Sequence, residues 1–207
     1  VSSVALTIPA NSVLRHVLTD VSFEGSRLAA RVAIDSDEPV HDVFETDDVA
    51  FAVVPPRKRL AVQLVTEGNL FLQASLFLRE NVDLTVVTPG EYTGPGGHDV
   101  TFVDRAAVDL SAPGRYVLFD PPEGGVFEHL GRLDTPGVTR VRHGHPLVQG
   151  LTFADAGIAE ASKLKTERGD EVVVAGPRGA PLILTRQDAA GARTFVAVAF
   201  DIRRSLL

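Results

Sequence analysis

The sequence predicts an α/β fold with a central, largely parallel sheet, preceded by a small all-β segment. Three observations predict it. The run Leu60–Val65 is almost entirely apolar, which is typical of a strand buried on both faces of a sheet. A turn at Thr66–Asn69 follows, and apolar residues then return with helical spacing from Leu70. Further strand-like runs end in a hairpin pattern around Ala189–Ala192, which indicates antiparallel additions at one edge of the sheet.

Composition limits the classes of protein that the chain can belong to. The 207 residues are enough for a full core and for one or two domains. A net charge of −7 argues against nucleic acid as a partner. The absence of cysteine excludes disulfides, thiolate metal sites and cysteine nucleophiles. No run is long enough for a membrane span and no signal peptide opens the chain, and because the first residue is Val1 we expect a piece of a longer protein.

We place a domain boundary between residues 57 and 58. Residues 1–57 carry four basic and nine acidic side chains, whereas the rest of the chain carries sixteen and eighteen. The join follows Pro55-Pro56, which favours stiff, extended backbone. The chain therefore divides into a segment over 1–57 and a domain over 58–207.

The first segment is predicted to be all-β. Four runs alternate apolar and small or polar residues, or are short and apolar, with turn residues between them. These runs are Val4–Ile8, Val13–Phe23, Leu28–Ile34 and Phe51–Val54. Strands at this spacing favour a small antiparallel, sandwich-like arrangement.

Seven acidic residues gather in and around the loop 35–48 of this segment. Clustered carboxylates can bind a hard cation such as calcium. The spacing does not match an EF-hand loop, however, and the glycine that such a loop needs is absent. A solvated acidic loop is therefore the favoured interpretation. The residues are Asp35, Asp37, Glu38, Asp42, Glu45, Asp47 and Asp48.

The second segment alternates strand and helix patterns. A helix is expected from about Leu70 to Arg79, with Asn69 at its N-cap and with Leu72 and Leu76 facing the sheet. The later strands are expected at Val82–Thr88, Val100–Val103, Arg115–Phe119, Val172–Ala175, Pro181–Thr185 and Thr194–Phe200. Ligands of such folds bind beyond the carboxyl ends of the parallel strands.

Four short motifs resemble those of a known family. Val65–Leu72 reads VTEGNLFL, Asp47–Pro55 reads DDVAFAVVP, Phe119–Pro122 reads FDPP, and Phe200–Ser205 reads FDIRRS. With Asp42 upstream of the second of them, and in their order along the chain, these motifs resemble the class I glutamine-amidotransferase-like domain of large bacterial membrane proteins with an aerotolerance-regulator (BatA-type) region and a von Willebrand A domain. The likeness covers roughly residues 42–207. The chain departs from the family at Leu206-Leu207, where Asp-Leu-Pro is usual.

The resemblance implies a flavodoxin-like, class I amidotransferase-like sheet. It also implies an extracytoplasmic domain of a bacterial membrane protein, tethered by membrane helices that this sequence lacks. It implies neither enzyme activity nor a cofactor, and it implies other proteins or other domains of the parent chain as partners.

The residues themselves argue against acyl-transfer chemistry. Class I amidotransferases use a cysteine on a strained strand-to-helix turn, and this chain has no cysteine. The equivalent turn is expected at Asp120–Gly125, where Asp120 is the best substitute nucleophile. Pro121 and Pro122 follow it and remove two backbone donors that an oxyanion hole would need.

Two further polar motifs have two interpretations each. His143 and His145 can share one face of an extended segment and chelate a metal, and the HPLxxGL pattern from His145 resembles loops of ThuA-like proteins. The favoured interpretation is structural, because no third ligand lies nearby. Arg203 or Arg204 can clamp a carboxylate or phosphate, but an ion pair with Asp201, Asp104 or Asp120 is favoured.

The sequence therefore predicts a non-catalytic binding or scaffold module. The alternative is a hydrolase or amidotransferase-like enzyme that uses Asp120 or His145 in place of the thiol. The expected ligand is a small polar solute or a loop of a protein partner, with no metal and no nucleic acid. The candidate pocket comprises Glu67, Gly68, Asp104, Asp120, His143, His145, Asp201 and Arg203.

Overall fold

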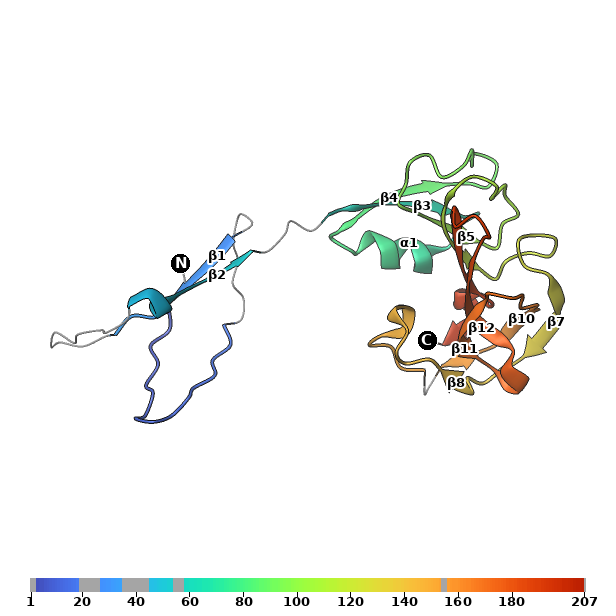
Figure 1. Ribbon diagram of the computed structural model, residues 1–207. Helices are drawn as coiled ribbons and strands as arrows, with labels where there is room; N and C mark the ends of the chain where they lie inside the picture. Colours follow the sequence, from blue (N-terminus) through green and yellow to red (C-terminus); the bar gives the residue numbers. More distant parts are fainter. Residues whose placement is uncertain (1–2, 19–26, 35–44, 54–57, 154–155, 207) are drawn as a thin grey trace. The chain divides into compact units, whose positions relative to one another are not determined.

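The computed structural model divides the chain into two compact units, Val1–Arg57 and Lys58–Leu207. It describes residues 3–18, 27–34, 45–53, 58–153 and 156–206 (Figure 1). We call the second unit the α/β unit and describe each unit by itself.

The amino-terminal unit contains a two-stranded antiparallel ribbon. Strand β1 (Arg27–Arg31) pairs with β2 (Val49–Val53), and a 3₁₀ turn, η1 (Glu45–Asp48), leads into β2. The predicted strand at Val4–Ile8 is wrong, as is the described part of the run Val13–Phe23, because residues 3–18 form no strand. Alternating residues have β propensity, but a strand also needs a partner to bond its backbone. Residues 35–44 of the acidic loop lie outside the described residues, so the cation hypothesis stays a prediction.

The α/β unit is built on an eight-stranded mixed sheet of order β4-β3-β5-β6-β13-β12-β11-β8. Its first five strands in this order run parallel to one another. They are β3 (Leu60–Val65), β4 (Val82–Val87), β5 (Val100–Asp104), β6 (Gly114–Phe119) and β13 (Arg193–Val198). The continuous apolar run at β3 is explained by its position between β4 and β5, where Val62, Leu64 and Val65 are at most 3% exposed.

Antiparallel strands extend the sheet beyond β13, as the hairpin pattern predicts. Strand β12 (Pro181–Gln187) pairs with β13 across a turn in which Gly191 has a positive φ of 69°. Strands β11 (Glu171–Ala175) and β8 (Arg140–Val141) complete this edge. Two small antiparallel pairs lie outside the large sheet: β7 (His129–Asp134) with β10 (Glu160–Leu164), and β9 (Gly157–Ile158) with β14 (Ser205–Leu206).

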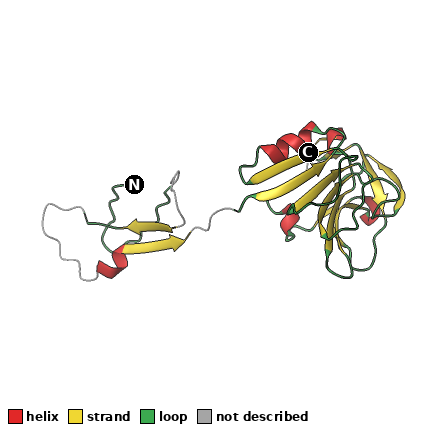
Figure 2. Ribbon diagram, turned by 90° about the horizontal axis from the view of Figure 1, so that it is seen from above, coloured by secondary structure: helices red, strands yellow, loops and turns green. Residues whose placement is uncertain are grey.

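One α-helix, α1 (Leu70–Phe77), is present among the described residues. Figure 2 colours helical segments red, and the short 3₁₀ turns share this colour. Asn69 caps α1, as predicted: its side-chain oxygen accepts from the backbone N–H of Leu72 at 3.2 Å. Leu72 is buried at 4% exposure, but Leu76 is only half-buried. The other helical segments of the α/β unit, among the described residues, are short 3₁₀ turns: η2 (Pro146–Val148), η3 (Pro177–Gly179) and η4 (Ile202–Arg204). No helix in the described part of the chain is long and apolar enough to span a membrane.

Loops replace the crossover helices that a doubly wound fold would place on the sheet. The connection from β4 to β5 is rich in glycine and proline, and the connection from β5 to β6 ends at Ala112-Pro113. Apolar residues of these loops, including Tyr92, Val108 and Leu110, pack on a core cluster around Val103. The structure is thus a mixed α/β fold with a large, mostly parallel sheet and few helices.

Candidate functional site

Three aspartates mark the carboxyl ends of three neighbouring strands. Asp104 is the last residue of β5, Asp120 directly follows β6, and Asp201 comes shortly after β13. Because β5, β6 and β13 are adjacent and parallel, these residues lie along one edge of the sheet. Strand β4 lies on one side of β3, and β5 and the strands after it lie on the other side, so the strand order reverses between β3 and β5. In open α/β sheets, ligands bind at such a switch point.

Asp104 is buried at 3% exposure, and its carboxylate accepts hydrogen bonds from three neighbouring side chains. Thr66 Oγ1 donates to one of its oxygens at 2.8 Å, and Asn69 Nδ2 donates to the other at 3.1 Å. The Nε of Arg105 adds a third contact at 3.3 Å. Asn69 thus both caps α1 and anchors Asp104, so this carboxylate joins the turn after β3 to the end of β5.

Asp201 forms ion pairs with two arginines, Arg203 and Arg105. Its carboxylate accepts from Arg203 Nη2 at 2.8 Å and lies 3.7 Å from Arg105 Nη1. It also accepts from the backbone N–H of Arg203 at 2.9 Å and so caps η4. Burial opposes ionisation of Asp201, but these hydrogen bonds and the two guanidinium charges outweigh it and hold the pKa of Asp201 below its ordinary value. The ion pair predicted for Arg203 is therefore confirmed.

Asp120 has an unusual backbone. Its φ of 40° is left-handed, a conformation that residues other than glycine adopt rarely and at a cost. Its Oδ1 accepts from Ser162 Oγ at 2.8 Å and from Arg132 Nη1 at 3.3 Å. Arg132 also lies 3.4 Å from Glu160. Neither Ser162 nor Arg132 can act as a general base for Asp120, because serine and arginine do not accept protons near neutral pH.

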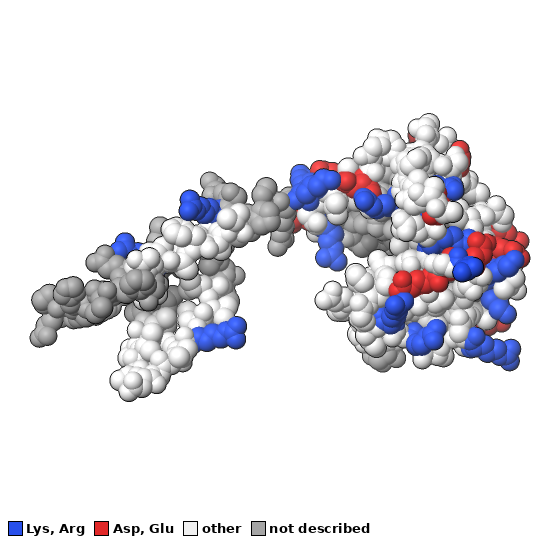
Figure 3. Space-filling view, viewed as in Figure 1, with Lys and Arg blue, Asp and Glu red and all other residues white. Residues whose placement is uncertain are grey.

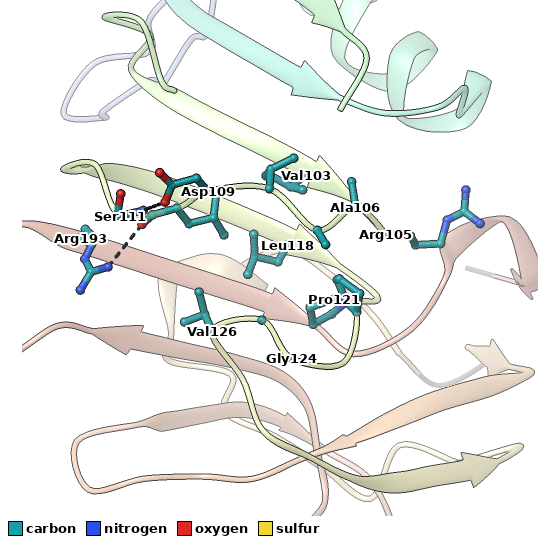
Figure 4. Close-up of a pocket in the computed structure, with 15 residues that line it drawn as sticks. Val103, Arg105, Ala106, Asp109, Ser111, Leu118, Pro121, Gly124, Val126 and Arg193 are labelled. Atoms are coloured by element: carbon teal, nitrogen blue, oxygen red, sulfur yellow. Dashed lines mark hydrogen bonds between the residues drawn. The ribbon is translucent and has the colours of Figure 1, made fainter. Parts of the chain in front are cut away.

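A pocket of about 290 Å³ opens beside this edge, on one face of the sheet (Figure 4). Its floor is apolar and includes Val103 and Leu118, which are at most 3% exposed. Loop 105–111 forms one wall, and Pro121, Pro122 and Gly124–Val126 form the other. Arg193 lies at one end, where its Nη1 donates to the carbonyl of Leu110 at 3.3 Å. The pocket therefore combines an apolar floor with polar groups at its rim.

The two histidines do not belong to this edge. Val141 of β8 pairs with Val174 of β11, and His145 Nε2 lies 3.7 Å from Glu171, the first residue of β11. Strand β11 runs in the direction of β13, so its first residue lies toward the opposite edge from Asp120. His145 caps η2 by accepting from the backbone N–H of Leu147 at 3.2 Å, and His143 is exposed. The grouping of His143 and His145 with Asp104 and Asp120 is therefore wrong.

The remaining predicted residues lie at the turn after β3. Glu67 is exposed, and Gly68 has a φ of 127°, which explains the choice of glycine there.

Arg204, in η4, forms an ion pair with Glu160 at 3.1 Å. No group of three or more histidine, aspartate or glutamate side chains in the described residues is arranged to hold a metal ion.

Sequence reasoning missed Arg105, Arg132 and Ser162. Arg105 follows Asp104 directly and has a left-handed φ of 51°, but no sequence pattern marks that conformation in an arginine. Arg132 and Ser162 come from β7 and β10, two strands that were not predicted. On the face seen in Figure 3, acidic and basic side chains of the α/β unit lie interspersed, as these ion pairs require.

The comparison with known proteins gives information on the fold but not on the function. No protein-family model and no curated protein sequence matches the chain. Among solved structures it is similar to "Cytoplasmic Protein STM3548 from Salmonella typhimurium", with a TM-score of 0.52 and 11% identity over 69% of this chain and 87% of that one. It also matches "Cytoplasmic Protein STM1381 from Salmonella typhimurium LT2", with a TM-score of 0.48 and 11% identity over 86% and 85% of the two chains.

One neighbour corrects an expectation. The resemblance described above implies an extracytoplasmic domain, whereas STM3548, the neighbour with a TM-score of 0.52, is named as a cytoplasmic protein. The extracytoplasmic placement is therefore wrong by this comparison. At 11% identity the likeness shows a shared fold and nothing about activity.

Proposed function

We propose that the α/β unit is a non-catalytic binding or scaffold module, a degenerate class I amidotransferase-like domain of flavodoxin-like topology. The order of the parallel strands supports the topology. Numbered along the chain, β3, β4, β5, β6 and β13 are arranged 2-1-3-4-5, which is the flavodoxin-like order. The motifs that resemble those of the amidotransferase-like family support the relationship, and the absence of cysteine supports the loss of catalysis.

The observation that carries the proposal is the set of hydrogen-bond and ion-pair partners around the three edge aspartates. The hydrogen-bond partners of Asp104 and Asp201 are hydroxyl, amide, backbone and guanidinium groups, and each of these two carboxylates is paired with an arginine. Acid–base catalysis needs a titratable group within hydrogen-bond reach of the reacting proton, commonly a pair of such groups. At Asp201 the hydrogen bonds and charge of Arg203 hold the pKa below its ordinary value and so stabilise the ionised carboxylate. Such pairs fix the edge of the sheet rather than transfer protons.

The pocket indicates the class of ligand. Its volume of about 290 Å³ is small for a ligand site, so it suits a compact molecule. The floor formed by Val103 and Leu118 favours an apolar body, and the rim with Asp109, Ser111 and Arg193 favours polar substituents. A loop of a protein partner with one small apolar side chain would meet the same requirements.

The test is ligand binding with a pocket-filling variant. A library of small polar metabolites is screened with the full chain by ligand-observed NMR, and hits are repeated with Ala106→Leu, which adds bulk at the pocket wall. The matched control is Ala190→Leu, an exposed position in the turn between β12 and β13. Hits lost in Ala106→Leu and retained in Ala190→Leu support the proposal. Equal binding by both variants would place the ligand elsewhere and reject this pocket.

One observation favours the enzyme alternative. The left-handed φ of Asp120, directly after a parallel strand, is the backbone state of a nucleophile on a strained turn. Ser162 and Arg132 would then orient the carboxylate. This alternative requires turnover of an ester or amide that is lost in Asp120→Asn while the fold is retained.

A further inference from the structure

Helix α1 is apolar on two opposite faces. Leu72, on the face toward the sheet, is buried, and Leu76 on the same face is half-buried. Large apolar side chains also point to solvent: Leu70, Phe71 and Phe77 are 79%, 65% and 76% exposed, and the C-cap Leu78 is 78% exposed. A helix that is apolar all round is normally covered on both sides.

The exposed residues form one continuous surface. An α-helix turns by about 100° per residue, so positions 70, 71, 74, 77 and 78 fall within an arc of about 120° opposite Leu72 and Leu76. We call these five residues the outer stripe. With a large apolar side chain presenting about 200 Å² when free, the four large members expose on the order of 600 Å². That area is at the upper end of the apolar patches found on monomers.

The outer stripe is symmetric about its centre. Residues 70–78 read LFLQASLFL, which is the same in both directions except for Gln73 and Ser75, and Ala74 stands in the middle. When two such helices pack antiparallel about a two-fold axis at Ala74, position 70 faces 78 and position 71 faces 77. The small central residue lets the helices approach, and the large pairs at each end fill the space beside it. A two-fold interface needs this kind of self-complementary surface.

Charge and area also favour a second copy of the chain as the occupant. The chain has a net charge of −7, yet no charged residue occurs from Leu70 to Leu78. A two-fold axis brings each charge near its own copy, so an uncharged stripe avoids this repulsion. Two outer stripes together would bury on the order of 1,200 Å², which is the lower limit of a specific protein interface.

We propose that two copies of this chain form a homodimer through α1, with the two helices antiparallel and Ala74 on the two-fold axis. Strand β4, at one edge of the sheet, packs against the inner face of α1 and leaves the outer stripe free for a partner. The partner covers the outer face of α1, and each copy keeps its own pocket beside the sheet edge.

The test measures the molar mass of the full chain by sedimentation equilibrium up to about 100 μM, a range that detects weak dimers. Phe71→Glu should raise the dissociation constant by at least about tenfold, because each dimer then buries two like charges. Leu130→Glu, at a 53% exposed position on β7, is the control and should leave the dimer unchanged. Circular dichroism confirms that both variants are folded.

A double variant tests the antiparallel arrangement. Phe71→Glu combined with Phe77→Lys places opposite charges against each other only when the helices run antiparallel, and it should restore the dimer that Phe71→Glu loses. In a parallel pair the same double variant sets like charges together. A wild-type chain that stays monomeric, a dimer insensitive to Phe71→Glu, or a double variant that stays monomeric would each overturn the proposal.

Discussion

Replacing Asp170 with asparagine should weaken the α/β unit more than any surface change. Asp170 and Arg186 form a bidentate ion pair, with both N···O distances at 2.8 Å and side chains only 2% and 12% exposed. Arg186 also donates to the carbonyl of Val126 at 2.9 Å and lies 4.4 Å from the centre of the Phe127 ring. The pair therefore fastens one wall of the pocket to the sheet.

The magnitude follows from what Asp170→Asn leaves behind. Asparagine keeps the shape but not the charge, so a buried guanidinium loses its main counter-ion, which costs about 3–5 kcal/mol in comparable sites. Glu167 lies 3.6 Å from Arg186 Nη1 and compensates in part. The expected loss in the free energy of unfolding is therefore about 3 kcal/mol at neutral pH.

The pH dependence gives a second check on the same variant. Burial opposes ionisation of Asp170, but the Arg186 hydrogen bond and charge outweigh it, so the pKa of Asp170 lies below its ordinary value. A lowered pKa in the folded state stabilises the fold above the unfolded-state pKa of about 4, and this contribution is lost as the pH falls through the folded-state value. Asp170→Asn should lack that part of the acid-dependent loss.

The assay uses the two tyrosines of the chain. Tyr92 and Tyr116 both lie in the α/β unit and the chain has no tryptophan, so tyrosine fluorescence during urea unfolding reports on this unit alone. Glu128→Gln, which removes an exposed ion pair with Lys165, is the control and should cost less than about 1 kcal/mol. A loss below about 1 kcal/mol for Asp170→Asn, or a loss equal to that of the control, would refute the reasoning.

Three further predictions concern the helix, the sheet edge and activity. Leu72→Ala should cost about 2–5 kcal/mol and the half-buried Leu76→Ala about 1 kcal/mol in the same urea assay, and equal costs would contradict the packing of α1. Because the pKa of Asp201 is lowered in the folded protein, Asp201→Asn should flatten the fall in the urea midpoint below about pH 4, and a wild-type slope in the variant would contradict the ion pair. The full chain should show no glutaminase, amidase or esterase turnover, and activity that Asp120→Asn abolishes without unfolding would establish the enzyme alternative.

Much of the α/β unit could be predicted because its strands carry local signals. The buried run at β3, the N-cap at Asn69 and the turn at Gly191 all depend on residues close in sequence. Strands β7 and β10 have no such signal. Most of β7 is exposed, the buried positions of β10 include a serine, and the two strands pair with each other outside the large sheet. In the amino-terminal unit, residues Val4–Ile8 alternate clearly, but the described residues 3–18 form no strand.

In the candidate site, too, local sequence could place some residues and not others. Asp104 and Asp201 could be placed at one edge because parallel strands end on the same side of a sheet. His145 was misplaced because β8 and β11 belong to the antiparallel part, where loops between strands alternate between the two edges. Ser162 reaches Asp120 across 42 residues of sequence, a contact that no local pattern encodes.

The sequence by itself determined the α/β class, the capped helix after β3, the absence of a thiol nucleophile and the aspartates at the strand ends, because each depends on residue type and short-range spacing. Only the tertiary structure decided which partners those aspartates have, where the pocket opens and which side of α1 stays uncovered. These properties depend on strand order and on contacts between residues distant in the chain. The energy of a buried charge or an exposed leucine is set by the groups around it after folding.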